Sequence, residues 1–304
     1  MERREFVAAA ASVIFIPSRR PSAYHDPTYV QALTGSLAGS RYELGGIPLT
    51  HRALGHLRQL ERSTSGTRDQ ALLKAGADLA DQAALVLYDA GRLSEANRAS
   101  VASLGMAHRS KDKPGQARAY ETLSRISLYR EDPARSIAYA EQGLSVGEIS
   151  HAQRAALMMR LGRSLALVPG QAAKSRSILD QARGTGGLSP FAEAALIGDV
   201  GIGFGHLKEF NEANSLLGEA AESIGQWSPL FQAQYLGRQI QAALAAKAVP
   251  FAADRMHELA RSLPFVSSER VNARAREVLK ASAKWRSAPE MSHARDHLRS
   301  MLAT

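Results

Sequence analysis

Apolar residues recur at helical spacing along almost the whole chain. From about residue 27 to the C-terminus they return every three or four positions, and no stretch shows the strict alternation expected of a half-buried strand. Short turn signals interrupt this pattern, for example Gly45-Gly46 before Pro48 and Asp132-Pro133. Connections this short make neighbouring helices antiparallel. The pattern therefore predicts an all-α protein built from helical hairpins.

A short motif repeats with a nearly constant period. Each copy ends at a small residue, which we call the anchor, in the first turn of the second helix of a predicted hairpin. The anchors are Ala96, Ser136, Ser175, Ala213 and Ala253, separated by steps of 40, 39, 38 and 40 residues. A small side chain there lets two helices cross closely. A fixed period of helical hairpins predicts a solenoid.

The first copy carries the most distinctive segment. Residues 91–96 read Gly-Arg-Leu-Ser-Glu-Ala and follow Leu-Val-Leu-Tyr-Asp-Ala at residues 85–90. This stretch resembles the turn between the two helices of a tetratricopeptide repeat. The resemblance implies a right-handed superhelical solenoid of antiparallel hairpins, with the first helix of each hairpin on the concave face. The other copies keep little more than the anchor, and the period exceeds the roughly 34 residues usual in that family, so the repeats are degenerate.

A second resemblance covers residues 1–145. An Arg-Arg-led, alanine-rich segment precedes a helix from Tyr29 to Tyr42, a helix from His51 to Arg62, and a long helix ending in Tyr-Asp-Ala-Gly at residues 88–91. This order is similar to the C-terminal effector half of bacterial Xre-type helix-turn-helix regulators that carry tetratricopeptide repeats. In that family a DNA-binding domain precedes this region, whereas only 26 residues precede it here and they contain no recognition helix. The resemblance implies a sensing half without the operator-reading half.

These patterns divide the chain into four parts. We expect an N-terminal helix and linker at 1–26, an N-terminal helical hairpin at 27–66, five tetratricopeptide-like repeats at 67–264, and C-terminal capping helices at 265–304.

Composition removes some kinds of chemistry and leaves others open. The chain has no cysteine, which excludes disulfides, thiolate metal sites and cysteine nucleophiles and fits a reducing compartment. The formal net charge is +9, which permits attraction to nucleic acid or anionic lipid. The basic residues are interleaved with acids, as in Arg270, Arg274, Arg276, Lys280, Lys284 and Arg286 against Glu269 and Glu277. This interleaving favours a solvated helix face over a polyanion site.

The N-terminal segment allows two interpretations. Arg3 and Arg4 followed by the apolar run Phe6–Ile16 resemble a twin-arginine export signal. The same residues also fit an amphipathic helix that Pro17 ends. The run is too short to span a bilayer, and no other segment is a transmembrane candidate. We expect a cytoplasmic protein, and both Phe6–Ile16 and the last helix at 290–302 are candidate capping or homodimer surfaces.

Few residues suggest a metal, a cofactor or catalysis. His293 and His297 lie one helical turn apart but lack an obvious third ligand, and His51 and His56 are spaced too far around a helix to act together. We therefore predict no metal and no cofactor. No Ser-His-Asp order or paired carboxylate arrangement stands out, so we predict that the chain is not an enzyme.

A glycine run, Gly-Asp-Val-Gly-Ile-Gly-Phe-Gly at 198–205, looks superficially like a phosphate-binding loop. It lies within a predicted helix and follows no strand, contrary to that motif. We expect these glycines to let a neighbouring helix or a ligand approach closely, or to make a soft joint.

The candidate binding surface is the concave face implied by the repeat resemblance. It combines arginines, which grip carboxylates, with tyrosines, which offer a flat apolar plate. The predicted positions are Asp81, Tyr88, Glu121, Arg125, Tyr129, Arg163, Asp199, His206, Tyr235 and Arg238, with Leu85 and Arg160 beside them. Alternatively, the tyrosines fill space between helices and the arginines pair with local acids.

The sequence as a whole predicts a binding module. We expect a non-enzymatic regulatory or scaffold protein that binds a peptide, a protein segment or a small effector in its groove, in transcriptional or signalling control. Two alternatives stay open: direct nucleic-acid binding by the basic surface, and an accessory biosynthetic enzyme that uses the groove as a pocket.

Overall fold

The computed structural model describes residues 22–302. Within that range the chain forms fourteen α-helices, four short 3-10 helices and no strand. The α-helices are α1 (Pro27–Leu44), α2 (Thr50–Thr64), α3 (Gln70–Asp89), α4 (Leu93–Arg109), α5 (Lys113–Tyr129), α6 (Pro133–Ser145), α7 (His151–Leu165), α8 (Ala172–Arg183), α9 (Pro190–His206), α10 (Phe210–Ile224), α11 (Pro229–Ala245), α12 (Val249–Ser262), α13 (Glu269–Ala281) and α14 (Pro289–Leu302). The 3-10 helices are η1 (Ala23–His25), η2 (Ile47–Leu49), η3 (Leu263–Phe265) and η4 (Ser282–Trp285).

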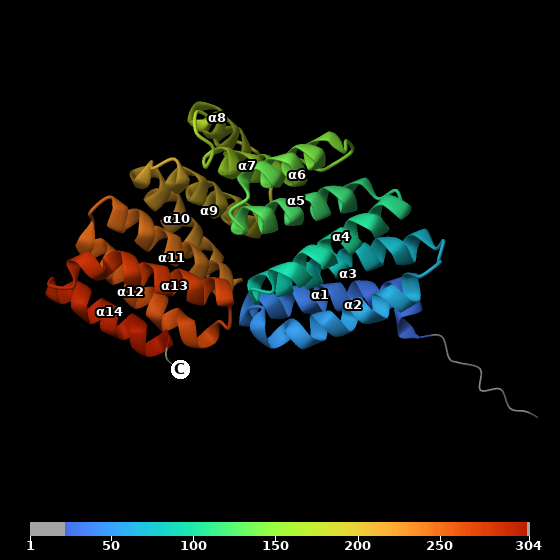
Figure 1. Cartoon of the computed structure of the whole chain (residues 1–304), viewed down its shortest axis with the longest axis horizontal. Helices are drawn as coiled ribbons and strands as arrows, with labels where there is room; N and C mark the ends of the chain where they lie inside the picture. The colour runs from blue at the N-terminus through green and yellow to red at the C-terminus, as the bar shows by residue number, and fades with distance from the viewer. Residues whose placement is uncertain (1–21, 303–304) are drawn as a thin grey trace, which may run out of the picture.

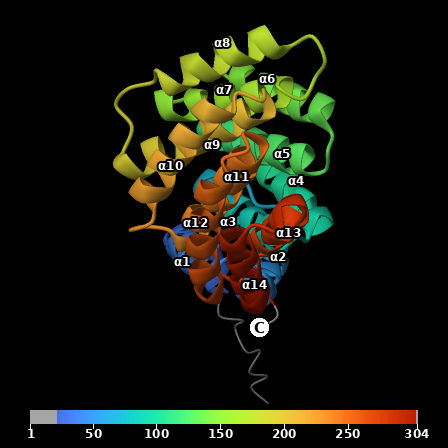
Figure 2. The ribbon, with the colours of Figure 1, turned by 90° about the vertical axis from the view of Figure 1, so that its left-hand side faces the viewer.

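The helices form two layers around a common centre. Five hairpins follow one another from α3 with α4 to α11 with α12, and their first helices α3, α5, α7, α9 and α11 contact each other in sequence along the inner layer (Figure 1). The second helices lie outside, and α14 packs on α12 (Figure 2). The prediction of an all-α solenoid of helix hairpins is confirmed.

The turns inside the five hairpins share one backbone feature. Each contains a residue with φ between 62° and 78°, and these residues are Gly91, Glu131, Gly170, Lys208 and Lys247. A left-handed residue after a helix lets the chain turn back sharply into the next one.

The position of these turns corrects the repeat register. In the first four hairpins the left-handed residue lies five positions before the predicted anchor, and those anchors are completely buried. In the fifth hairpin the same offset from Lys247 leads to Ala252, not Ala253. The sequence-based register was therefore wrong by one residue there, and the last step is 39 residues.

The ends of the inner layer meet, so the solenoid closes into a ring. Helix α1 contacts both α3 and α11. The turn after α1 also pairs with the segment before α13: Ser267 N donates to Leu44 O (2.8 Å), and Ile47 N donates to Ser267 O (3.1 Å). In addition, Ser228 Oγ donates to Tyr42 O (3.0 Å). These backbone contacts join parts of the chain that are far apart in sequence.

Asp89 is the centre of this closure. Its carboxylate is fully buried and accepts hydrogen bonds from Gly46 N (2.6 Å) and Ser268 Oγ (2.8 Å). A Cβ on Gly46 would lie 2.3 Å from Val86 O, and a Cβ on Gly45 would lie 2.5 Å from Ser267 O. The two glycines therefore let the turn after α1 lie directly against α3 and the segment before α13.

Within the glycine run of α9, Gly198 and Gly203 also permit close packing. A Cβ on Gly198 would meet the Tyr235 ring at 2.5 Å, and one on Gly203 would meet Leu179 at 2.7 Å. Neighbouring helices thus approach the α9 backbone closely. Gly205 differs, because its nearest neighbour, Ala213 Cβ, would be at an ordinary 3.9 Å.

No described helix is both long enough and apolar enough to cross a membrane. The predictions made for Arg3, Arg4 and Phe6–Ile16 lie outside the described residues.

Candidate ligand-binding site

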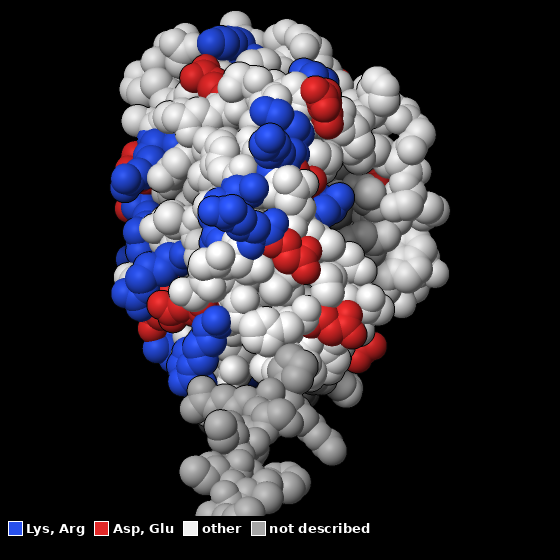
Figure 3. All heavy atoms as spheres, turned by 90° about the vertical axis from the view of Figure 1, so that its right-hand side faces the viewer, with Lys and Arg blue, Asp and Glu red and all other residues white. Residues whose placement is uncertain are grey.

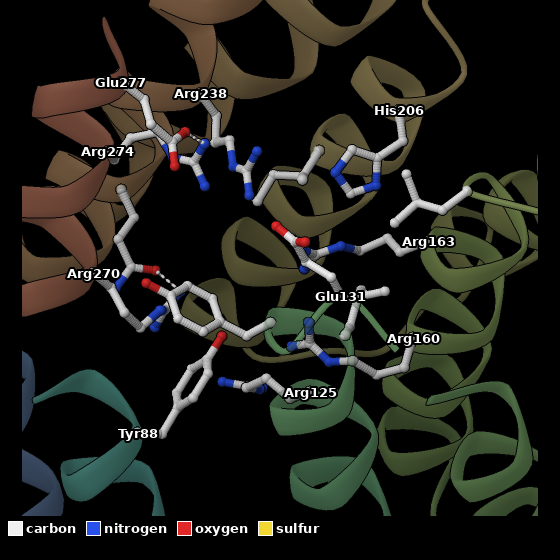
Figure 4. Close-up of a pocket in the computed structure, with 15 residues that line it drawn as sticks. Tyr88, Arg125, Glu131, Arg160, Arg163, His206, Arg238, Arg270, Arg274 and Glu277 are labelled. Atoms are coloured by element: carbon white, nitrogen blue, oxygen red, sulfur yellow. Dashed lines mark hydrogen bonds and ion pairs between the residues drawn. The ribbon is translucent and has the colours of Figure 1, made fainter. Parts of the chain in front are cut away.

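The inner helices surround a lumen with a cavity at each end. The larger lumen cavity, of about 460 Å³, lies between the C-terminal halves of α3, α5, α7, α9 and α11 and the inward face of α13 (Figure 4). Six arginines dominate its wall, and we call it the arginine chamber. It is lined by Tyr88, Arg125, Leu128, Tyr129, Glu131, Arg160, Arg163, Leu167, Ile202, His206, Gln234, Arg238, Arg270, Arg274 and Glu277.

A layer of ion pairs lies at the inner end of this chamber. Glu121 accepts from Arg125 Nη2 (2.6 Å) and Arg160 Nε (3.2 Å). Asp199 accepts from Arg160 Nη2 (2.8 Å) and Arg163 Nη1 (2.5 Å). Burial opposes ionisation of Asp199, but Arg160 and Arg163 outweigh it and hold the pKa of this carboxyl below its ordinary value. We call these five residues the ion-pair layer.

Helix α13 supplies another wall of the arginine chamber. The Arg270 guanidinium lies 4.3 Å from the centre of the Tyr88 ring and donates to Gln234 Oε1 (2.8 Å). It also lies 3.6 Å from Asp89, the carboxylate of the ring closure. One arginine therefore links the chamber to the contacts that close the ring.

Arg238 lacks the acidic partner that the other chamber arginines have. Among the described residues it makes no ion pair, and its one side-chain contact is a long one of 3.5 Å from Nη1 to Gln241 Oε1. Burial, with Arg274 and Arg163 nearby, lowers the pKa of Arg238 well below its ordinary value. An anion in the chamber would relieve this electrostatic penalty.

Other terminal nitrogens in the chamber are also available. Arg125 uses Nη2 for Glu121, and Arg163 uses Nη1 for Asp199. Their other terminal nitrogens make no hydrogen bond to any described residue. Guanidinium groups from α5, α7 and α11 thus retain donors for a guest.

His206 adds a neutral group to the same chamber. Burial, reinforced by Arg238 and Arg163, lowers the pKa of this imidazole to about 3. Its Nδ1 is buried without a hydrogen-bond partner. His206 therefore offers a neutral polar group rather than another positive charge at pH 7.

The second lumen cavity has a different character. It occupies about 250 Å³ between the inner helices and the end of α1, on the other side of the ion-paired residues. Its wall contains three aromatic rings beside four arginines, whereas the other cavity has two tyrosines beside six, and we call it the aromatic chamber. Its characteristic residues are Arg41, Tyr42, Asp81, Phe191 and Phe231. Because Arg125 and Arg160 line both cavities, the ion-pair layer lies between them.

Asp81 is a buried acid of the aromatic chamber. Burial raises its pKa to about 7, although the Thr122 side chain opposes this shift. Its Oδ1 has no hydrogen-bond partner. Asp81 is therefore partly protonated near neutral pH, unlike the ion-paired Asp199.

The structure places the sequence-predicted site residues in three groups. Tyr88, Arg125, Tyr129, Arg163, His206 and Arg238 line the arginine chamber. Asp81, Glu121, Asp199 and again Arg125 line the aromatic chamber. Tyr235 lines neither cavity: it is 1% exposed and donates to Ala195 O (2.9 Å). The binding role of the whole set stays a prediction.

Helix α13 contributes residues to the site that the sequence pattern did not indicate. Arg270 and Arg274 were assigned to a solvated helix face, and this assignment was wrong, since both line the arginine chamber. Arg276 does lie at the surface, where its side chain is 56% exposed beside Glu269. The spacing of Arg270, Arg274 and Glu277 at i, i+4 and i+7 was the available signal, because it places the three on one face of a helix.

The histidines form other contacts. His297 Nδ1 lies 2.9 Å from His257 Nδ1 on α12, and His56 Nδ1 lies 2.6 Å from the Tyr24 hydroxyl. In residues 22–302 no group of three or more potential ligands could hold a metal ion.

Charge on one outer face is mixed. In Figure 3 the lysines and arginines form several separate groups, and aspartates or glutamates lie beside many of them.

Comparison with known proteins found similarity to solved structures but not to known sequences. No protein-family model matches the chain, and no curated protein sequence matches it. Among solved structures, the chain is similar to the TPR2AB-domain:pHSP90 complex of yeast Sti1, with 12% sequence identity and a TM-score of 0.24, over 83% of this chain and 99% of that one.

Proposed function

We propose that this protein is a non-enzymatic binding module whose arginine chamber takes up an anionic group of a peptide, a protein segment or a small effector. The observation that carries the proposal is Arg238, a chamber arginine with no ion pair among the described residues. A half-buried arginine without a direct ion pair, close to Arg163 and Arg274, is electrostatically unfavourable, so its position favours a ligand that brings a negative charge.

The closed ring limits the shape of the guest. Contacts of α1 with α3 and α11 close the inner layer, and the ion-pair layer blocks the far end of the chamber. A chamber of about 460 Å³ is within the size range of small-molecule sites. We infer that a chain end or a compact molecule enters the chamber, and that an extended peptide does not pass through it.

The cellular setting is part of the same proposal. The resemblance of residues 1–145 to the effector half of Xre-type regulators favours transcriptional or signalling control. Binding would act by contacts alone, without turnover. A cytoplasmic location and a homodimer stay predictions, which cell fractionation and analytical ultracentrifugation test.

Ligand capture tests the binding proposal. Tagged protein is isolated from its native cells, and co-purifying proteins and small molecules are identified by mass spectrometry. Three forms are compared: the wild type, Arg238→Met, and Arg183→Met as the matched control. Arg183 is an exposed arginine on α8 that pairs with Glu212. Since hydrogen bonds to charged groups contribute about 1.5–3 kcal/mol, Arg238→Met should reduce recovery of the ligand at least roughly tenfold.

The outcome separates the candidate functions. Equal recovery with Arg238→Met and the wild type would remove the arginine chamber from the proposal. Recovery of nucleic acid, with affinity that falls steeply with salt, would favour the outer surface instead, because many phosphate contacts produce that slope.

A further inference from the structure

The aromatic chamber contains a buried arginine that makes no ion pair with the described residues. Arg41 is only 2% exposed, yet its guanidinium makes no ion pair and no hydrogen bond with the described residues. Its Nε is buried and unpartnered. Buried arginines are rarely left unpaired, because desolvating a charge is unfavourable unless another group compensates. Arg41 thus has hydrogen-bonding capacity that the protein does not use.

Aromatic rings fix the orientation of this group. The Arg41 guanidinium lies 4.7 Å from the centre of the Tyr42 ring and 5.9 Å from that of Phe231. The Phe191 ring lies 5.1 Å from Tyr42 and 6.0 Å from Phe231. Stacking engages the face of a guanidinium and leaves its N–H edge for a carboxylate, which two parallel hydrogen bonds can hold.

The acids that line the aromatic chamber are either paired with arginines or partly protonated. Glu121 and Asp199 are held by the arginines of the ion-pair layer. Burial keeps Asp81 partly protonated near neutral pH, because its pKa is raised to about 7. The carboxylate of a ligand in this chamber would therefore meet little electrostatic repulsion from these acids.

We propose that the aromatic chamber is a binding site for a small aromatic carboxylate. The carboxylate would bind the N–H edge of Arg41, and the ring would pack against Phe191, Leu188 and Leu196, which also line the chamber. The volume of about 250 Å³ accommodates a single-ring acid. This site is separate from the arginine chamber and does not depend on the function proposed for it.

Trp227 can report ligand binding at this site through its fluorescence. Trp227 lies 6.4 Å from the Phe191 ring, centre to centre. The chain has two tryptophans, so Trp285→Phe leaves Trp227 as the only one. Benzoate is titrated into this variant, followed by tryptophan fluorescence and calorimetry. Benzamide serves as the neutral analogue, and acetate as the carboxylate without a ring. We expect saturable binding of benzoate, and at least tenfold weaker binding of both analogues.

Arg41→Met and Arg238→Met locate the binding. Arg41→Met removes the charge and should weaken benzoate at least tenfold, whereas Arg238→Met, in the other chamber, should leave it unchanged. Circular dichroism checks that each variant is folded. If Arg41→Met does not fold, Arg41→Lys replaces it, because lysine keeps the charge without the planar fork and should still weaken binding. The proposal is overturned if benzoate does not saturate, if benzamide binds as well, or if the Arg41 variant binds benzoate like the wild type.

Discussion

The two chambers are built at opposite ends of the same inner helices, and their chemistry differs sharply. The arginine chamber collects arginines from the C-terminal halves of α5, α7 and α11. The aromatic chamber collects Phe191 and Phe231 from the first turns of α9 and α11, Tyr42 from the end of α1, and the buried acid Asp81 from the middle of α3. Glu121 precedes Arg125 on α5, whereas Asp199 on α9 pairs with Arg160 and Arg163 on the preceding inner helix α7, and these ion pairs lie between the two chambers. A repeat array can thus build two distinct sites from one set of helices, with an ion-pair layer as the partition.

Removing an acid of the ion-pair layer, which separates the two chambers, should lower the stability of the protein the most. Asp199→Ala leaves Arg160 and Arg163 buried without their shared carboxylate. Breaking a buried ion pair from one side typically costs about 3–5 kcal/mol, and we expect the free energy of unfolding to fall by that amount in urea denaturation. The matched control is Asp180→Ala, because Asp180 lies 3.9 Å from Arg176 in an exposed pair.

Exposed pairs contribute about 0–1 kcal/mol, so the control should change stability little. Similar losses in the two variants would mean that the ion-pair layer does not support the ring.

The two chambers should respond to pH in opposite directions. Asp81 has a folded-state pKa of about 7, above its ordinary 3.8. The folded protein therefore holds this proton longer than the unfolded chain, and its contribution to stability is lost as pH rises from about 4 to 7. His206 has a folded-state pKa of about 3, below its ordinary 6.5. Its contribution is present above pH 6.5 and is lost as pH falls toward 3.

Difference profiles of unfolding free energy against pH test this contrast. Asp81→Asn should gain stability relative to the wild type between pH 4 and pH 8, by on the order of 2–4 kcal/mol. His206→Gln should gain relative to the wild type on acidification, by a smaller amount because His206 is less buried. Parallel profiles for the two variants would contradict the assignment of opposite shifts.

Much of the fold was accessible from the sequence because each hairpin repeats its own local signals. Apolar periodicity gave the helices, and the small anchors gave the crossing points. The error of one residue in the last repeat arose at Ala252-Ala253, where two adjacent alanines are equally small. Only the backbone of Lys247, with φ of 62°, separates them.

The ring closure was beyond sequence reasoning. Asp89 and Ser268 are 179 residues apart, and nothing in either segment marks the other as its partner. Without that contact, α13 looked like a terminal cap, and Arg270 and Arg274 looked like surface charges. The repeat pattern indicated inward positions only for helices inside the array, so it found Arg238 and missed these two.

The smallest expected effects compare the middle of α9 with its C-terminal end. Gly198, on the aromatic-chamber side, has no room for a Cβ because the Tyr235 ring would lie 2.5 Å away. Overpacking a core costs about 1–3 kcal/mol, so Gly198→Ala should destabilise the protein by that amount in urea denaturation. Gly205, beside His206, has ordinary space, and Gly205→Ala should stabilise by about 0.5–1 kcal/mol because alanine loses less backbone entropy in a helix.

The Gly198 and Gly205 variants should also differ in benzoate binding, because Gly198 packs against Tyr235. Tyr235 lies 6.0 Å from Phe231, which forms part of the aromatic chamber. A displaced Tyr235 should therefore also weaken benzoate binding, measured by Trp227 fluorescence, while Gly205→Ala leaves it unchanged. If both alanine variants were equally stabilising, close approach of helices to α9 could not be the reason for its glycines, and the packing around Gly198 would be as loose as the packing around Gly205.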